Sequence, residues 1–256
     1  MDKKLQGKQA LITGSGTGIG REVALEFARQ GADVVLHYAN SKDGAVSAVA
    51  EISAAGGKAI AIQANLGVVD ECVQLVDRAV DFLGGLDILI NNAGINEVWD
   101  FEDVTPEQFD QLYNVNIRGQ FFCAQRAVKH MLARCKGAIV NLTSVHGFAG
   151  APGHSVYAGT KGAIIAWTRE LGVELAPKQI RVNAVAPGWI EVPSHYTKYA
   201  DYDIQQGGKV IPIGRVGAPL DVAKACVFLA SDNAAFIVGT TLLVDGGTVG
   251  LMSLAA

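Results

Sequence analysis

The sequence has few of the features that mark nucleic-acid-binding or membrane proteins. Its 256 residues carry a formal net charge of −4, and the longest basic run is Lys3-Lys4, so we expect neither nucleic acid nor an anionic membrane as a partner. No stretch approaches the roughly 18 apolar residues of a membrane span. The amino terminus turns polar at Gln6 and lacks the apolar core of a signal peptide. These absences favour a cytoplasmic protein with a small-molecule ligand.

Cysteine is also sparse. The four cysteines are scattered without any C-x-x-C pair, which argues against a zinc site or a disulfide framework, and we expect no bound metal. As small, weakly polar side chains they suit a buried core. They are Cys72, Cys123, Cys135 and Cys226.

Short aliphatic runs recur between longer amphipathic stretches. This alternation is typical of an α/β fold, in which a parallel sheet is covered by helices on both faces. Hydrophobic residues make up 50% of the chain, enough for one substantial core, so we expect one domain over residues 1–256. Seven runs are candidate strands: Ala10–Ile12, Val34–Leu36, Ala59–Ile62, Ile88–Ile90, Ala138–Val140, Val182–Val185 and Leu242–Val244.

Two further segments have recognisable boundaries. Thr105-Pro106-Glu107-Gln108 combines an N-cap threonine, a proline at the first helical position and a capping-box glutamine, and it predicts one long helix from there to about Met131. The least regular segment, residues 188–217, follows the sixth candidate strand and is rich in glycine and proline. Because ligands of open α/β sheets bind outside the carboxyl ends of the strands, we expect this segment to form a substrate lid.

A tyrosine–lysine pair carries the strongest chemical signal. Tyr157 follows Ser144 by thirteen residues and precedes Lys161 by four, so in a helix the tyrosine and lysine lie on one face, one turn apart. A phenol with its ordinary pKa of ~10 is a poor base at neutral pH. We expect the neighbouring ammonium to lower that pKa, so that Tyr157 can exchange a proton with an alcohol or carbonyl oxygen.

Three loops at the ends of candidate strands fit a dinucleotide. The glycine-rich turn Thr13–Gly20 runs from the first strand into a helix, where bare backbone N–H groups and the positive helix end can meet a pyrophosphate. Such a turn alone is weak evidence, because glycine also serves positive φ angles. The second loop is Asn91–Gly94 and the third is Pro187–Ile190. Together they predict a nicotinamide coenzyme.

In this order the motifs resemble those of the classical short-chain dehydrogenase/reductase family, over essentially the whole chain. They are Thr13-Gly14-x3-Gly18-Ile19-Gly20, Asn91-Asn92-Ala93-Gly94, Asn116, Ser144, Tyr157-x3-Lys161, Pro187-Gly188 and Asp245-Gly246-Gly247. The resemblance, to glucose dehydrogenases and 3-oxoacyl-ACP reductases in particular, implies a single Rossmann-type, doubly wound parallel sheet of about seven strands. It also implies hydride transfer between NAD(P) and a secondary alcohol or carbonyl, and a homotetramer.

The resemblance implies a role for each of four catalytic residues. Tyr157 is expected to be the general acid/base, and Lys161 to lower its pKa and hold the nicotinamide ribose. Ser144 is expected to bind the reacting oxygen. Asn116 is expected to hold a water that links Lys161 to solvent.

Coenzyme choice depends on the end of the second strand. Tyr38 stands where NAD-preferring relatives place an aspartate, and the polar residues Asn40, Ser41 and Lys42 follow it, which favours NADP. Thr17 stands where many NADP-preferring relatives carry a basic residue, so NAD stays an alternative. The expected coenzyme-binding residues are Gly14, Ser15, Thr17, Gly18, Ile19, Gly20, Tyr38, Asn40, Ser41, Asn65, Leu66, Asn92, Ala93, Gly94, Tyr157, Lys161, Pro187, Gly188 and Ile190.

The residues expected around the reacting centre are polar and aromatic, which favours a sugar or polyol as substrate. They are Asn96, Ser144, His146, His154, Tyr157 and Trp189. One rival is a 3-oxoacyl-ACP reductase, which needs a basic patch for its acidic carrier protein; Arg134 and Lys136 are the candidates. A secondary-metabolite or steroid ketone reductase is a third option. A non-catalytic NAD(P)-sensing scaffold belongs to a different class.

Overall fold

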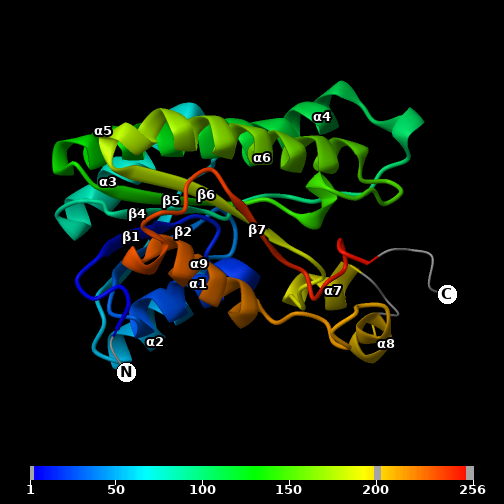
Figure 1. Ribbon diagram of the computed structural model, residues 1–256, viewed down its shortest axis with the longest axis horizontal. Helices are drawn as coiled ribbons and strands as arrows, with labels where there is room; N and C mark the ends of the chain where they lie inside the picture. Colours follow the sequence, from blue (N-terminus) through cyan, green and yellow to red (C-terminus); the bar gives the residue numbers. More distant parts are fainter. Residues whose placement is uncertain (1–2, 199–202, 252–256) are drawn as a thin grey trace.

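Seven parallel strands form the sheet of this protein (Figure 1). The computed structural model describes residues 3–198 and 203–251. The strand order is β3-β2-β1-β4-β5-β6-β7, so the chain winds outward from β1 in both directions and the predicted α/β, Rossmann-type sheet is confirmed. The strands are β1 (Gln9–Ile12), β2 (Asp33–Tyr38), β3 (Ala59–Gln63), β4 (Ile88–Asn91), β5 (Gly137–Leu142), β6 (Ile180–Pro187) and β7 (Thr241–Val244).

Helices cover both faces because side chains alternate along each strand. On one face Ile12 and Leu36 pack with Phe27 in one core, while on the other Leu11 and Val35 share a second core. The first face is covered by α1 (Gly18–Arg29), α2 (Lys42–Ala54) and α9 (Pro219–Ala230), and the second by α3 (Val69–Leu83), α5 (Gln120–Arg134) and α6 (Ser155–Leu175) (Figure 1).

The helix predicted from Thr105 to about Met131 is not one regular helix. Its start is confirmed: Thr105 Oγ1 accepts from the Gln108 N–H at 3.3 Å, and Gln108 Oε1 accepts from the Thr105 N–H at 3.0 Å. The first helix, α4 (Pro106–Tyr113), then passes into a π-helical segment, Asn114–Gly119, before α5 continues to Arg134. π-helical turns inside α-helices often occur at functional sites, and this one contains Asn116.

The segment predicted as a lid contains two short helices, α7 (Pro193–Lys198) and α8 (Ile204–Lys209), beyond the carboxyl end of β6 (Figure 1). Residues 199–202 of the segment lie outside the described residues. Among residues 3–198 and 203–251, none of the helices combines the length and the apolar composition that a membrane span requires.

Candidate active site

Ser144, Tyr157 and Lys161 meet where β5 ends and α6 begins. Ser144 caps a short 3₁₀ turn, and its Oγ accepts a hydrogen bond from the His146 N–H at 3.2 Å. That bond occupies one lone pair of Oγ and leaves its own proton for another acceptor. As predicted, Tyr157 lies in the first turn of α6 with Lys161 one turn on. The ammonium lies 5.3 Å from the centroid of the Tyr157 ring and donates to the Leu142 carbonyl at 3.0 Å.

The prediction that Lys161 lowers the pKa of Tyr157 is wrong. Burial raises the pKa of Tyr157 to about 12, against a smaller effect of the hydrogen bond with Ser144. Burial also lowers the pKa of Lys161 to about 8. Loss of water disfavours the charged form of both groups. At neutral pH the geometry therefore supports a protonated phenol, which is a proton donor.

Asn116 is fully buried and holds the loop after β4. Its Oδ1 accepts from the Ile95 N–H at 2.8 Å, and its Nδ2 donates to the Ile95 carbonyl at 2.9 Å and to Thr160 Oγ1 at 3.2 Å. A Cβ placed on Gly94 would lie 3.2 Å from Asn116 Oδ1 and 3.6 Å from Lys161 Nζ. The two polar groups thus face one small space at Gly94, and the water relay through Asn116 stays a prediction.

The glycine turn after β1 is held tightly against the loop after β4. Gly14 has a φ of 63°, and a Cβ there would lie 2.7 Å from the Cα of Ala93. The side chain of Asn92 donates to the carbonyls of Thr13 and Gly14, both at 2.9 Å. A Cβ on Gly20 would collide with the Gly14 carbonyl. Gly14 and Gly20 are therefore required for packing inside the turn, a reason beyond the predicted approach of a pyrophosphate.

Thr13 opens the glycine motif, but the sequence predicted no role for its side chain. Its Oγ1 accepts from the N–H groups of Asn92 and Ala93, both at 3.0 Å, and donates to the Ile90 carbonyl at 3.2 Å. One hydroxyl thus joins two loops that are 77 or more residues apart in the chain. No pattern within the first loop alone predicts a hydrogen-bond partner so far away in the sequence.

The predicted coenzyme residues follow the carboxyl ends of five strands. Tyr38 ends β2 and is buried, while Asn40 is exposed and Ser41 precedes α2. After β3, the Asn65 N–H donates to Glu71 Oε2 at 2.6 Å, and Leu66 is buried. The remaining predicted positions are in the turn after β1 (Ser15, Thr17, Gly18, Ile19), in the loop after β4 (Asn92, Ala93, Gly94) and at the end of β6 (Pro187, Gly188, Ile190).

This edge of the sheet fits a dinucleotide. The amino terminus of α1 begins at Gly18, directly after β1, so its first N–H groups have no partners within the helix and can meet a pyrophosphate. Gly18 has a φ of 53° and a Cβ there would lie 3.2 Å from Val192. The bare turn therefore leaves little room for side chains and presents backbone to a ligand. The contribution of each residue to coenzyme binding stays a prediction.

Two imidazoles stand beside the tyrosine. The ring centroids of His146 and His154 are 4.5 Å apart, and that of Tyr157 lies 5.4 Å from His146 and 6.3 Å from His154. Burial, with the nearby His154 and Lys161, lowers the pKa of His146. His154 Nδ1 lies 2.9 Å from the Pro152 carbonyl. We call His146, His154 and Tyr157 the ring cluster; it brings together three of the predicted substrate residues beside Ser144.

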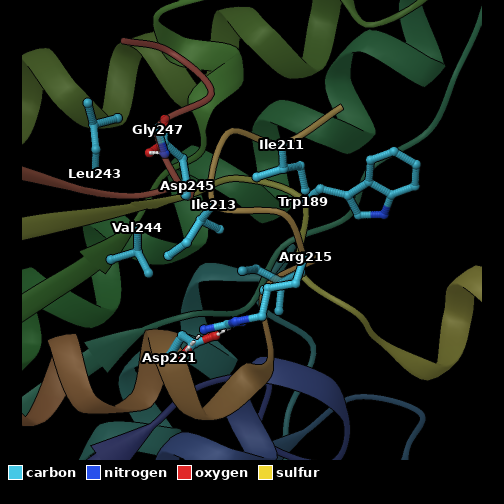
Figure 2. A pocket seen from close by; sticks show the side chains of 12 residues that line it. Trp189, Ile211, Ile213, Arg215, Asp221, Leu243, Val244, Asp245 and Gly247 are labelled. Atoms are coloured by element: carbon cyan, nitrogen blue, oxygen red, sulfur yellow. Dashed lines mark hydrogen bonds and ion pairs between the residues drawn. The ribbon is translucent and has the colours of Figure 1, made fainter. Parts of the chain in front are cut away.

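Trp189 lines a cavity that the ring cluster does not share, and its contact with substrate stays a prediction. It lines a cavity of ≈ 450 Å³ whose other walls include Ile211, Ile213 and Leu243, and Figure 2 shows the indole beside Ile211. No member of the ring cluster lines this cavity. The reason is the backbone of Gly188–Ile190, which pairs with β7 and with Gly217 and directs the indole toward α8. Asn96 is exposed, one residue after Ile95.

The proposed basic patch lies at the opposite edge of the sheet. Arg134 ends α5, and Lys136 precedes β5, so both are at the amino end of a strand whose carboxyl end leads to Ser144. Their charges are also paired: Arg134 lies 3.4 Å from Asp87, and Lys136 lies 3.5 Å from Asp232. A carrier protein docked there would not face the active site.

Comparison with known proteins agrees with this geometry. Residues 14–249 match the family described as Enoyl-(Acyl carrier protein) reductase. The chain is 40% identical to the tetrahydroxynaphthalene reductase of Pyricularia oryzae, over 95% of this chain and 90% of that protein. It is 42% identical to the versicolorin reductase of Emericella nidulans, over 95% and 96%.

Solved structures lead to the same family. A short chain dehydrogenase from Burkholderia cenocepacia J2315, solved in complex with NADP, superposes with a TM-score of 0.88 at 37% identity, covering 96% of this chain and 99% of that one. Fold, motifs and relatives therefore agree: the chain belongs to the short-chain dehydrogenase/reductase family and is an NAD(P)-dependent oxidoreductase.

Proposed function

We propose that the protein is an NADPH-dependent reductase of hydroxylated aromatic ketones of the polyketide type. The observation that carries the proposal is the 40–42% identity, over nearly the whole chain, to proteins named as tetrahydroxynaphthalene, trihydroxynaphthalene and versicolorin reductases. A ketone reductase of secondary metabolism was the third substrate option that the sequence left open. It replaces the sugar or polyol as the leading one.

The ring cluster supports an aromatic substrate. Flat rings pack well against the faces and edges of imidazole and phenol rings, and His146 and His154 lie 4.5 Å apart beside Tyr157. Because the Pro152 carbonyl can only accept, His154 Nδ1 carries the proton, and in the neutral ring Nε2 is an acceptor. A phenolic hydroxyl is a donor of the matching kind. The cluster thus offers both stacking and polar recognition to a polyphenol.

The protonation states support reduction. When bound, the coenzyme supplies the hydride that reaches the carbonyl carbon. Tyr157, whose pKa is raised to about 12, is protonated at neutral pH and donates its proton to the carbonyl oxygen. Ser144, with its oxygen fixed by the His146 N–H, donates a hydrogen bond to that same oxygen. Lys161 places a positive charge beside the phenolate that forms, and Asn116 holds the neighbouring loop in place.

The coenzyme preference for NADPH has support at the end of β2. No carboxylate stands there to repel a 2′-phosphate. Ser41 precedes α2 and its side chain makes no capping bond to that helix; its hydroxyl lies against Gly16 of the glycine turn, next to the positive end of α2. The solved relative from Burkholderia cenocepacia contains NADP at 37% identity.

Oxidation of an aldose or polyol by NADP⁺ is the second candidate, since the polar atoms of His146 and His154 also suit aliphatic hydroxyls. A 3-oxoacyl-ACP reductase fits less well, because Arg134 and Lys136 lie at the far edge of the sheet and are paired with acids. We also infer a homotetramer. Four large apolar side chains are exposed on the helices α4–α6, namely Phe109 (43%), Phe121 (41%), Leu132 (40%) and Val173 (68%).

The test follows NADPH oxidation by absorbance with tetrahydroxynaphthalene and trihydroxynaphthalene as substrates. A parallel series presents NADP⁺ with aldoses and polyols, and NADPH with a 3-oxoacyl thioester. Turnover in the first series alone supports the proposal. Turnover only with sugars, or only with the thioester, would replace it with the corresponding alternative. Light scattering of the purified protein tests the tetramer separately.

A further inference from the structure

His37 is a buried polar residue that none of the family motifs contains. It lies on β2, is 2% exposed, and makes hydrogen bonds in two directions. Its Nδ1 accepts from the Gly14 N–H at 2.9 Å, and its Nε2 lies 3.0 Å from the Ala64 carbonyl. Its backbone carbonyl accepts from the Ser15 N–H at 2.8 Å. One residue therefore contacts both the turn after β1 and the end of β3.

The partners define the chemical state of the ring. The Gly14 N–H is a donor, so Nδ1 must present a lone pair; the Ala64 carbonyl only accepts, so Nε2 must carry the proton. The ring is thus neutral and has one tautomer. Burial lowers the pKa of His37, with the bond to Ala64 acting the other way, which agrees with the neutral form.

The titratable groups near the His37 ring do not compete for its two hydrogen bonds. β1 and β3 carry no titratable side chain. On α3, Glu71 accepts from the Asn65 N–H at 2.6 Å, and the Cys72 thiol donates to the Leu66 carbonyl at 3.4 Å. On β2 itself the neighbour is Tyr38. Both α3 side chains hold the same loop that His37 holds through Ala64, so this loop is fixed from two sides.

The two segments joined by His37 are separated by a strand. The glycine turn begins at Gly14 after β1, and the loop Asn65–Leu66 follows β3, with β2 between them. A dinucleotide lying along the carboxyl edge must meet both segments. Their separation therefore decides whether one ligand can contact both at once, and preorganised spacing reduces the ordering that binding requires.

We propose that His37 is a positioning residue for the coenzyme, whose neutral ring fixes the spacing between the Gly14 turn and the loop after Ala64. The two amides that it engages, Gly14 and Ser15, are thereby withdrawn from the ligand. The N–H groups at the start of α1, from Gly18 on, are among those that can meet a pyrophosphate. This assignment concerns coenzyme binding alone and holds for any substrate.

Three variants of the full chain test the hydrogen bonds of His37 with Gly14 and with Ala64 separately. In His37→Asn the side-chain oxygen takes the place of Nδ1 and keeps the bond from Gly14. In His37→Gln the amide nitrogen takes the place of Nε2 and keeps the bond to Ala64, and His37→Leu keeps neither. His130→Gln is the matched control, because His130 binds Asp77 on the surface between α3 and α5.

The readout is the Kd for NADPH, measured by fluorescence titration. We expect His37→Leu to raise it about 5- to 30-fold, the loss that corresponds to one or two net hydrogen bonds. His37→Asn and His37→Gln should each recover part of that loss, and His130→Gln should match the parent protein. An unchanged Kd in His37→Leu would overturn the proposal. So would equal losses in all three His37 variants, because a role in packing alone gives no advantage to polar replacements.

A measurement on the unaltered protein covers the case in which variants fail to fold. Nitrogen-15 NMR of the histidine rings, with and without NADPH, reports the tautomer of His37 directly. The proposal requires the neutral form with the proton on Nε2 in both states at pH 7. A charged ring, or a proton on Nδ1, would remove the acceptor for the Gly14 N–H and refute the assignment.

Discussion

The ammonium of Lys161 lies over the face of the Tyr157 ring, 5.3 Å from its centroid, and is anchored to the Leu142 carbonyl. Both groups are buried, and burial moves the pKa of the tyrosine up to about 12 and that of the lysine down to about 8. The pair is therefore arranged as a neutral acid next to a cation at pH 7. That state suits proton donation to a carbonyl oxygen.

Removing the phenolic proton should stop this chemistry without removing the coenzyme site. We expect Tyr157→Phe to lower kcat for ketone reduction by roughly 10²- to 10⁴-fold, the usual contribution of a general acid, while the Kd for NADPH stays near that of the parent protein. Steady-state kinetics and a binding titration measure the two quantities. Tyr113→Phe, which removes a hydroxyl from α4, is the control and should retain activity. Full activity in Tyr157→Phe would exclude Tyr157 as the general acid. Binding of NADPH without turnover in any assay would favour the non-catalytic NAD(P)-sensing scaffold.

The pH dependence of reduction should follow Lys161 and not Tyr157. Below a pKa of about 8 the lysine is charged; as the pH rises through that value the charge is lost, while Tyr157 stays protonated until about 12. We therefore expect kcat/KM for reduction to fall above pH ~8 with the loss of one proton. In Lys161→Arg the cation persists to higher pH, so the fall should move upward. A profile that is flat to pH ~10 would contradict this assignment.

Gly94 lies where the loop after β4 meets the catalytic groups. In Gly94→Ala the new methyl group would lie 3.2 Å from Asn116 Oδ1, which must give by a few tenths of an ångström, and at an ordinary contact distance of 3.6 Å from Lys161 Nζ. We expect kcat to fall roughly 10- to 100-fold, with a circular dichroism spectrum like that of the parent. Gly150→Ala has nothing within 4 Å of the added Cβ and should be nearly silent. Equal activity of both variants would mean that Asn116 and Lys161 tolerate displacement.

Asn116 should matter for stability as well as for catalysis. Asn116→Ala leaves the N–H and carbonyl of Ile95 without their side-chain partners, and unpaired buried groups cost about 1–3 kcal/mol. Urea unfolding followed by fluorescence should show a loss of that size in the free energy of unfolding. Asn233→Ala, at an exposed position, serves as the reference. A loss no larger than in the reference would show that water replaces Asn116 at Ile95.

Coenzyme preference can be reversed at the end of β2. An acid in place of Tyr38 would accept hydrogen bonds from the ribose hydroxyls of NADH and repel the 2′-phosphate of NADPH. We expect Tyr38→Asp to raise the KM for NADPH about tenfold or more and to lower the ratio of NADPH to NADH efficiency. Tyr38→Phe keeps the ring and should leave that ratio unchanged. A ratio unaffected by the aspartate would place the 2′-phosphate away from this residue.

The sequence was sufficient for the sheet and for the positions of Ser144, Tyr157 and Lys161, because strand alternation and helical spacing are local properties. It did not reveal the side-chain hydrogen bonds of Thr13 and His37, whose partners follow other strands, since register between strands is set only in the folded sheet. The π-helical turn at Asn116 and the direction of the Trp189 indole toward α8 depend on neighbouring backbone in the same way. The direction of the pKa shift of Tyr157 was missed because burial is not visible in a four-residue spacing.

The burial of the four cysteines could also be predicted only in part from the sequence. Cys72, Cys123 and Cys226 are buried as expected, whereas Cys135 is exposed. It occupies the residue after α5 with a φ of 49°, a left-handed position that ends the helix. Helix ends are commonly made in this way, although glycine is the usual choice there. Hydrophobic character alone does not predict such a position.

The strand order also constrains how the chain reaches this structure. β1 pairs with β2 on one side and with β4 on the other, so β1 gains its second neighbour only when residues 88–91 are present. Every pairing in the sheet is parallel and needs a crossover. Contacts distant in sequence must close before the core can form, which makes folding slow relative to proteins with local contacts. During synthesis on the ribosome, the unpaired edge of β1 therefore stays open until β4 has emerged.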